Sequence, residues 1–252
     1  MRDDASNSEF RVDFTVDLAG LPVDDLRAMA EAGQEIVDIY RALAKTDDNV
    51  VGELLKGHET FYEWDHYPPG DVYDQESHGQ FYYHAHPPVE RFKSEHGHFH
   101  TFLRPKGMPS GVKPAPVPNY KKLDDPDDEL SHLIAIAMTS EGFPFRLFTV
   151  NRWVTGEVWH TAADVITLLD YFKIDHAQPS WPVNRWITAM IRLFKPHITE
   201  LLGARDQAVA AWTEEHPDRD VYEDRELEVT SYMDVSVEDH ARAVARTLME
   251  RA

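Results

Sequence analysis

A doubled histidine pattern between residues 79 and 104 constrains the fold more than any other part of the chain. Two His-x-His units lie in this segment, separated by a polar run that contains Pro87 and Pro88. Successive side chains of a strand point to opposite faces, so each unit places both imidazoles on one face. Aromatic residues around both units favour strands, and the proline-containing run favours a connection. The segment therefore predicts a β-hairpin with two adjacent rows of imidazoles, formed by His84, His86, His98 and His100.

Imidazoles gathered on one sheet face need partners for their ring nitrogens. Each buried polar group left unsatisfied costs roughly 1 to 3 kcal/mol, and one bound cation can satisfy several rings at once. We therefore interpret the cluster as a metal site. A hydrogen-bonded histidine network without metal and a set of solvated histidines are the alternatives. The candidate ligands are His84, His86, Glu90, His98 and His100, and weaker candidates are His58, His96 and His132.

The absence of cysteine limits the chemistry of such a site. Without cysteine the chain has no disulfide, thiolate nucleophile or iron–sulfur cluster, and any metal must be held by imidazole or oxygen. This donor set suits a divalent first-row transition metal: iron or zinc, or else copper. Two histidines with one carboxylate suit non-haem iron oxidation, whereas three histidines with a water suit zinc hydrolysis. For either enzyme class we expect a small-molecule substrate. The rival is a non-catalytic sensor, carrier or interaction module in which the histidines are structural.

Hydrophobic periodicity predicts helices at both ends of the chain and strands between them. Together these elements predict an α+β fold, in which an antiparallel sheet carries the histidine hairpin and the terminal helices pack on it. We expect helices over 22–45, over 161–173, on both sides of Pro196 and from Ser236. A further helix is expected to follow Asp48 and to carry His58 on its apolar face. Strands are expected over 132–137, 145–150 and 227–235.

Composition and charge set the expected domain organisation and partners. Residues 1–12 form an acidic segment predicted to be disordered, and 13–252 are expected to form a single α+β domain with a long proline-rich loop at 105–130. Neither a secretory signal nor an apolar run long enough to span a bilayer is visible, so we expect a cytoplasmic protein without a membrane partner. The sequence does not indicate an oligomeric state.

Part of the hairpin resembles the metal-binding motif of the cupins, H-x-H-x3-E-x6-G. His84, His86, Glu90 and Gly97 match it. The resemblance implies a cupin-like β-barrel, here with helical extensions, in which the two histidines and the glutamate bind a metal. Two features depart from the family pattern. The glycine expected six residues before the first histidine is displaced to Gly79, and the second cupin motif does not occur.

A second resemblance covers nearly the whole chain. The segments YYHAHP, HGHFHTFLRPKGMP, LFTVNRWVTGE and PSWPVNRWITAMIRLFKP are similar to those of an uncharacterised bacterial family, a domain of unknown function. This resemblance implies one folded unit and brings no activity with it.

The formal net charge of −20 predicts that the protein does not bind DNA or RNA at physiological salt. Nucleic-acid affinity depends on cationic side chains that release counterions from phosphates, and an acidic chain is repelled instead. Fluorescence anisotropy with labelled duplex and single-stranded probes should show no binding at micromolar protein. Salt-sensitive micromolar binding would contradict this prediction.

Overall fold

A computed structural model describes residues 8–118 and 120–251 of the 252-residue chain. Most of the expected disordered segment, residues 1–7, lies outside the described residues. The end of that segment lies against the sheet. Arg11 forms a parallel bridge with Tyr232, and the Val12 amide donates a hydrogen bond of 2.9 Å to the Tyr232 carbonyl.

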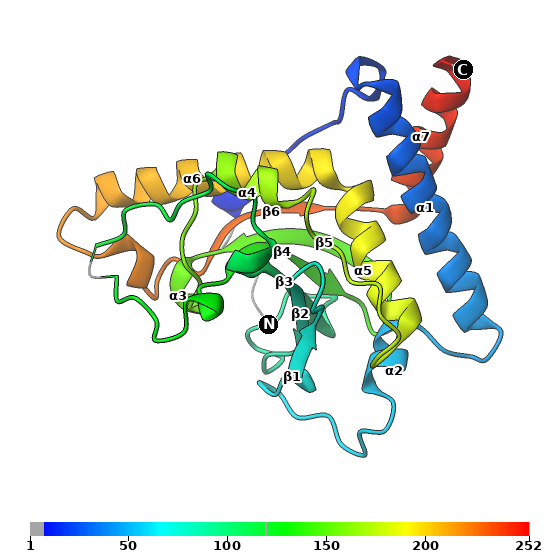
Figure 1. Cartoon of the computed structure of the whole chain (residues 1–252), viewed down its shortest axis with the longest axis horizontal. Helices are drawn as coiled ribbons and strands as arrows, with labels where there is room; N and C mark the ends of the chain where they lie inside the picture. The colour runs from blue at the N-terminus through cyan, green and yellow to red at the C-terminus, as the bar shows by residue number, and fades with distance from the viewer. Residues whose placement is uncertain (1–7, 119, 252) are drawn as a thin grey trace.

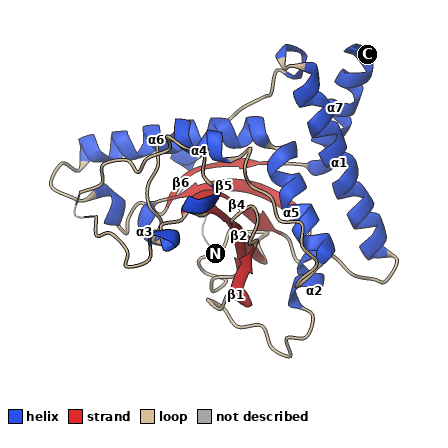
Figure 2. Cartoon of the chain, in the orientation of Figure 1, coloured by secondary structure: helices blue, strands red, loops and turns tan. Residues whose placement is uncertain are grey.

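The centre of the fold is an open antiparallel sheet whose six strands follow one another in chain order (Figures 1 and 2). The α+β prediction is confirmed. The alternative prediction of a cupin-like barrel is wrong, because β1 and β6 form the two edges of the described sheet and do not pair with each other. The strands are β1 (Tyr67–Tyr73), β2 (Gly79–His84), β3 (Gly97–Leu103), β4 (Ser131–Met138), β5 (Pro144–Val150) and β6 (Val229–Asp234).

The longer helices cover one face of this sheet, and the histidine face is covered by loops and by the single-turn helix α3, whose Val154 packs there. α6 packs on β5 and β6, α5 contacts the strands through Trp186, and α1 packs on the outer side of α5 next to α7 (Figure 1). The helices are α1 (Val23–Ala44), α2 (Val50–Leu55), α3 (Arg152–Thr155), α4 (Ala162–Leu168), α5 (Trp181–Leu193), α6 (Lys195–Glu215) and α7 (Val237–Arg251). Short 3-10 helices are η2 (Leu18–Gly20), η3 (Pro105–Gly107), η4 (Pro126–Asp128) and η5 (Val221–Glu223).

The alternation of side chains along β2 and β3 separates an apolar face from a polar one. Phe81, Tyr83 and Phe99 belong to the main core together with residues of the helices, and the Phe99 ring lies 5.3 Å from the Trp186 ring of α5. The residues between them point to the opposite face. There Phe92, Phe148 and other residues form a second, smaller apolar cluster beside the histidines. Both faces of these two strands are therefore buried.

Several predicted elements differ from the observed ones at their ends. The helix expected after Asp48 begins with Asn49 as its cap, whose side-chain oxygen accepts hydrogen bonds from two amides of the first turn. That helix ends at Leu55, before Gly57 with its φ of 84°, so His58 is not on a helical face. The helix expected over 161–173 ends at Leu168, and the break at Pro196 is confirmed by the separation of α5 from α6 at Phe194.

Strand β1 and helix α3 were not predicted. β1 has the sequence YPPGDVY, in which two prolines and a glycine obscure the period-two pattern. Proline lacks an amide donor and is tolerated mainly on edge strands, and β1 is an edge strand with an irregular register against β2. α3 is a single turn, too short for a periodic signal.

The proline-rich loop at 105–130 packs along the sheet and its connections. The Arg104 guanidinium at its start donates hydrogen bonds to the Asp127 carbonyl and the Asp128 carboxylate near its end. The Ala115 amide donates to the Trp159 carbonyl. These contacts hold the loop against neighbouring segments of the fold.

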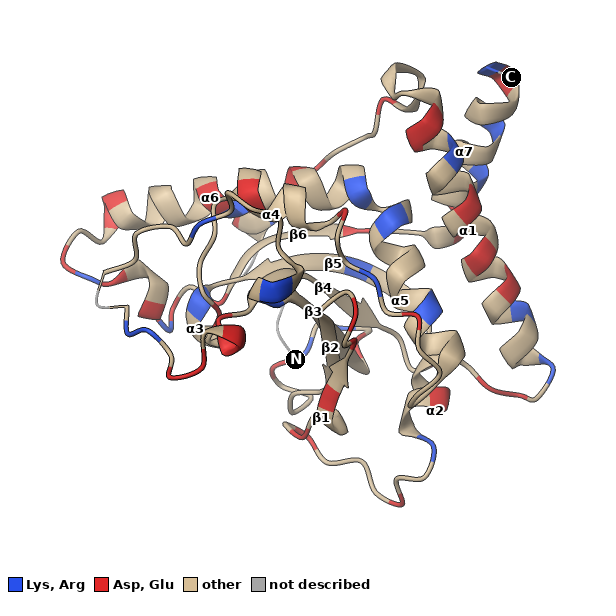
Figure 3. Ribbon diagram, in the orientation of Figure 1, with Lys and Arg blue, Asp and Glu red and all other residues tan. Residues whose placement is uncertain are grey.

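Acidic residues are spread over the outer surface of the molecule. Figure 3 shows Asp and Glu along α1 and α6 and on the loops around β1, with Lys and Arg scattered among them. Within the described residues, none of the helices has the length and apolar character needed to cross a bilayer.

We predict that Phe99→Ala lowers the free energy of unfolding by about 3 to 5 kcal/mol, the range for removing a buried phenylalanine ring. Phe99 is fully buried between the strands and α5, and the alanine would leave a cavity there. Denaturant unfolding should measure this loss. Met249→Ala is the matched control, because Met249 is 73% exposed and its truncation should change stability little. Equal effects of the two substitutions would contradict the described packing.

Candidate metal centre

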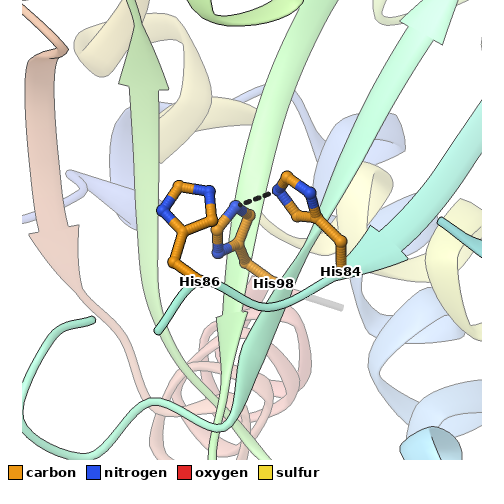
Figure 4. Close-up of side chains that lie close together, drawn as sticks. All are labelled: His84, His86 and His98. Carbon is orange, nitrogen blue, oxygen red and sulfur yellow. Dashed lines mark hydrogen bonds between the residues drawn. The ribbon is translucent and has the colours of Figure 1, made fainter. Parts of the chain in front are cut away.

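The register of the β2–β3 hairpin brings His84 directly opposite His98. Their Nε2 atoms lie 2.8 Å apart, and His86, just beyond the end of β2, adds a third ring (Figure 4). All three side chains are buried, and one nitrogen from each lies within 4.8 Å of those of the other two. The ligands of a tetrahedral zinc ion lie about 3.3 Å apart, given metal–nitrogen bonds near 2.0 to 2.1 Å. This cluster of three histidines could therefore hold a metal ion.

Gly97 allows the close pairing of the two strands at this point. A Cβ atom on Gly97 would lie 2.5 Å from the His84 carbonyl oxygen and 2.7 Å from the Tyr83 hydroxyl. Any other residue would push β3 away from β2 beside the His84–His98 pair. The glycine is thus needed for the geometry of the cluster.

Glu95 orients the ring of His98. Its carboxylate accepts a hydrogen bond of 2.5 Å from His98 Nδ1 and another from the Phe92 amide. Burial alone would raise the pKa of Glu95, but His98 and the Phe92 amide outweigh burial and lower it, so the carboxylate is ionised. A proton on Nδ1 of a neutral imidazole leaves the lone pair on Nε2, where a metal would bind.

His86 is held by its neighbours on the loop and not by strand pairing. The indole ring of Trp64 stacks on the His86 imidazole with centroids 4.3 Å apart. The Arg91 guanidinium donates a hydrogen bond to the His86 carbonyl and also pairs with Glu63 at 2.8 Å. The third member of the cluster therefore depends on contacts made by loop residues.

His100 and His132 extend the cluster along the sheet. His100 Nδ1 lies 3.0 Å from His132 Nε2, and the His132 amide donates to the Glu157 carboxylate at 2.8 Å. Burial lowers the pKa of His100 and lowers that of His132 to about 3, so both rings are neutral at pH 7. Burial raises the pKa of Glu157 to about 7, although Arg205 partly opposes this rise. Among the described residues, His100 Nε2 has no hydrogen-bond partner.

A small cavity adjoins the histidine cluster. Its free volume is about 20 Å³, which is enough for one water molecule or one ion. Its polar lining includes His86, Glu90, His98 and His100, and its apolar lining includes Phe92 and Phe148. Four of the five principal predicted ligands thus line one space, and the fifth, His84, does not line it but lies 2.8 Å from His98, which does.

The remaining candidates lie outside the group of three histidines. Glu90 lines the cavity but is not part of the group, so the first three ligands of the cupin motif do not come together. His58 is exposed, with its ring packed edge-on against Tyr67. His96 turns away from the cluster, and its Nδ1 lies 2.7 Å from the hydroxyl of Tyr83 on the helix side of the sheet.

Two residues of the site were not among the predicted ones. The contact of Glu95 could be predicted from local sequence, because Glu95 lies three residues before His98 and a carboxylate there can reach the imidazole. The role of Trp64 could not be predicted from local sequence, because the contact between its ring and His86 joins two loops whose packing no short-range pattern encodes.

Comparison with known proteins places the chain in one family and gives no activity. A family model described as a domain of unknown function, DUF6969, matches residues 30–235. No curated protein matches the chain, and neither does any solved structure.

We predict that the metal-free protein loses stability as the pH falls from about 7 to about 5. Burial lowers the pKa values of His84 and His100, and lowers those of His132 and His197 to about 3, from an ordinary value of 6.5. Below that value the unfolded chain binds protons that the folded protein excludes, so acid favours unfolding. Glu157 acts in the opposite direction, because its raised pKa lets the folded protein bind a proton first.

The destabilising effect of the four histidines exceeds the stabilising effect of Glu157. The free energy of unfolding should therefore fall by an amount on the order of several kcal/mol. Denaturant unfolding at a series of pH values measures it. A free energy of unfolding that stays constant or rises as the pH falls would contradict the neutral, buried state of these rings.

Proposed function

The chain belongs to the DUF6969 family of domains of unknown function, and we propose from its histidine geometry that it is a metal-dependent enzyme acting on a small molecule. The ion is held by His84, His86 and His98. One observation carries this proposal: three buried imidazoles lie with their nitrogens within 4.8 Å of one another beside a cavity with room for one water.

The donor set favours zinc as the ion. Three neutral imidazoles and one open position form the ligand set of catalytic zinc sites, and such an ion supplies an activated water at neutral pH. Burial, and then the neighbouring histidines, lower the pKa of His84. Protons therefore do not compete with a metal for this ring at neutral pH. The hydrogen bond between Glu95 and His98 supplies the carboxylate support that ligating histidines commonly have.

His100 has a separate role in this proposal. It is fully buried, it lines the cavity, and its Nε2 has no partner among the described residues. His132 fixes the ring through Nδ1. We assign His100 Nε2 a hydrogen bond to the water or substrate atom that occupies the cavity.

Iron is the second candidate, favoured by the position of Glu90. Its side chain lines the same cavity, and a carboxylate together with two histidines forms the facial set used by non-haem iron oxygenases. The non-catalytic alternative is a histidine network in which the 2.8 Å contact between His84 and His98 is a permanent hydrogen bond.

We predict that the protein, purified without a His-tag or a metal column, contains about one divalent metal ion per chain. The double substitution His84→Ala, His98→Ala should remove most of this metal while circular dichroism stays that of a folded protein, because the main core lies on the other face of the sheet. Elemental analysis by mass spectrometry measures the metal. His58→Ala, at an exposed histidine, is the control and should keep its metal.

Two further variants separate the roles of the carboxylates. Glu95→Gln should weaken metal affinity about 10- to 100-fold, the usual effect of losing such a partner. Glu90→Gln should leave zinc affinity unchanged, and a large loss of metal in Glu90→Gln would instead favour the iron set. Native protein without stoichiometric metal, together with an unfolded double variant, would overturn the proposal and support the structural network.

A further inference from the structure

Trp64 forms an exposed aromatic surface directly beside the proposed metal centre. Its ring is inclined by only 28° to that of His86, with 4.3 Å between the centroids, while the residue remains 54% exposed. The Trp64 amide donates a hydrogen bond of 2.9 Å to the carbonyl of Ala85, which precedes His86. The indole is therefore fixed against one ligand and still available to an incoming molecule.

The backbone of Trp64 adopts a conformation that a bulky residue seldom takes. Its φ is 71°, in the left-handed region. Such conformations are unfavourable for residues other than glycine and persist where the surrounding contacts enforce them, often at binding sites. Here the Ala85 hydrogen bond and the His86 stack are those contacts.

The size of the cavity places most of a substrate outside it. A free volume of about 20 Å³ admits one small group and no organic body. Trp64 does not itself line the cavity, but its ring stacks on His86, which does. The exposed indole is thus separated from the cavity by one side chain, and we call this surface the rim, on which the rest of a substrate can lie.

Charges near this rim favour a cationic ligand. Asp65 follows Trp64 and is exposed, and Glu90 lies on the cavity wall. The nearby Arg91 is engaged by Glu63 and by the His86 carbonyl, which leaves Lys93 as the exposed cation of the same loop. The carboxylate of Glu95 also offsets the charge of a divalent ion.

We propose that Trp64, with Asp65 and Glu90, forms a rim subsite that binds the ammonium group of a small organic cation while the polar end of the same molecule enters the cavity. This substrate class rests on the proposed function. Indole is the side chain that attracts cations most strongly through its ring face, and adjacent carboxylates add to this attraction.

Isothermal titration of the metal-loaded protein tests the subsite with two probes. One is choline, and the other is its neutral isostere, in which a tert-butyl group replaces the trimethylammonium group. Choline should bind at least about ten-fold more tightly than the isostere, because only the cation gains from the ring face and the carboxylates.

Variants at the rim should identify the residue responsible. Trp64→Gly, which suits the left-handed backbone, should weaken choline binding by about ten-fold or more, and Trp64→Phe should weaken it less. Trp181→Phe, at a tryptophan that is 51% exposed on α5, is the matched control and should not alter binding. Metal content is measured in every sample, and choline affinities are compared only between samples loaded to one zinc ion per chain, because the Trp64 ring also contacts His86.

The outcomes separate this inference from the proposed metal site. Stoichiometric metal with equal affinity for the two probes, or with choline binding unaffected by Trp64→Gly, overturns the rim subsite and leaves the metal centre standing. Choline binding that depends on Trp64 in a protein without metal supports the subsite and overturns the proposed enzyme. Loss of choline binding in Trp181→Phe to the same extent as in Trp64→Gly also overturns the subsite.

Discussion

The pairing of His84 with His98 across the β2–β3 hairpin is the constraint on which the rest of the site depends. Side chains alternate strictly along a strand, so a slip of one residue would turn the histidines into the helix-covered core and the aromatic residues out of it. Phe81, Tyr83 and Phe99 prevent that slip, because they are fully buried among the helices. The apolar packing of one face thereby fixes the register that assembles imidazoles on the other.

The polar side chains of the histidine face can be buried because they form hydrogen bonds with one another or lie beside the cavity. His98 has Glu95, His100 has His132, and the amide of His132 has Glu157. Each contact removes part of the cost of burying polar groups. This arrangement separates two regions: the helices and the apolar strand residues form the main core, while the opposite face carries the histidines of the proposed metal site. A metal ion would then contribute to activity more than to folding.

The sequence predicts the part of this arrangement that depends on short-range periodicity. Period-two spacing of His84, His86, His98 and His100 was sufficient for the hairpin and for the shared face. Helical spacing was sufficient for α1, and the missing amide donor of Pro196 was sufficient for the break between α5 and α6. The sequence did not reveal the edge strand β1, whose prolines conceal its pattern, or the end of α2 before His58. Nor did it reveal that Trp64 meets His86, since that contact depends on how two loops pack in three dimensions.

The donor set of the centre is measured most directly by X-ray absorption spectroscopy at the K-edge of the metal in protein loaded with zinc. The account predicts three imidazole nitrogens, recognised by their multiple-scattering pattern, and one oxygen ligand, at distances of about 2.0 to 2.1 Å. The His86→Ala variant should lose one imidazole from this pattern. A spectrum with only oxygen ligands, or one identical in the wild-type protein and the variant, would contradict the assignment of His84, His86 and His98 as the ligands.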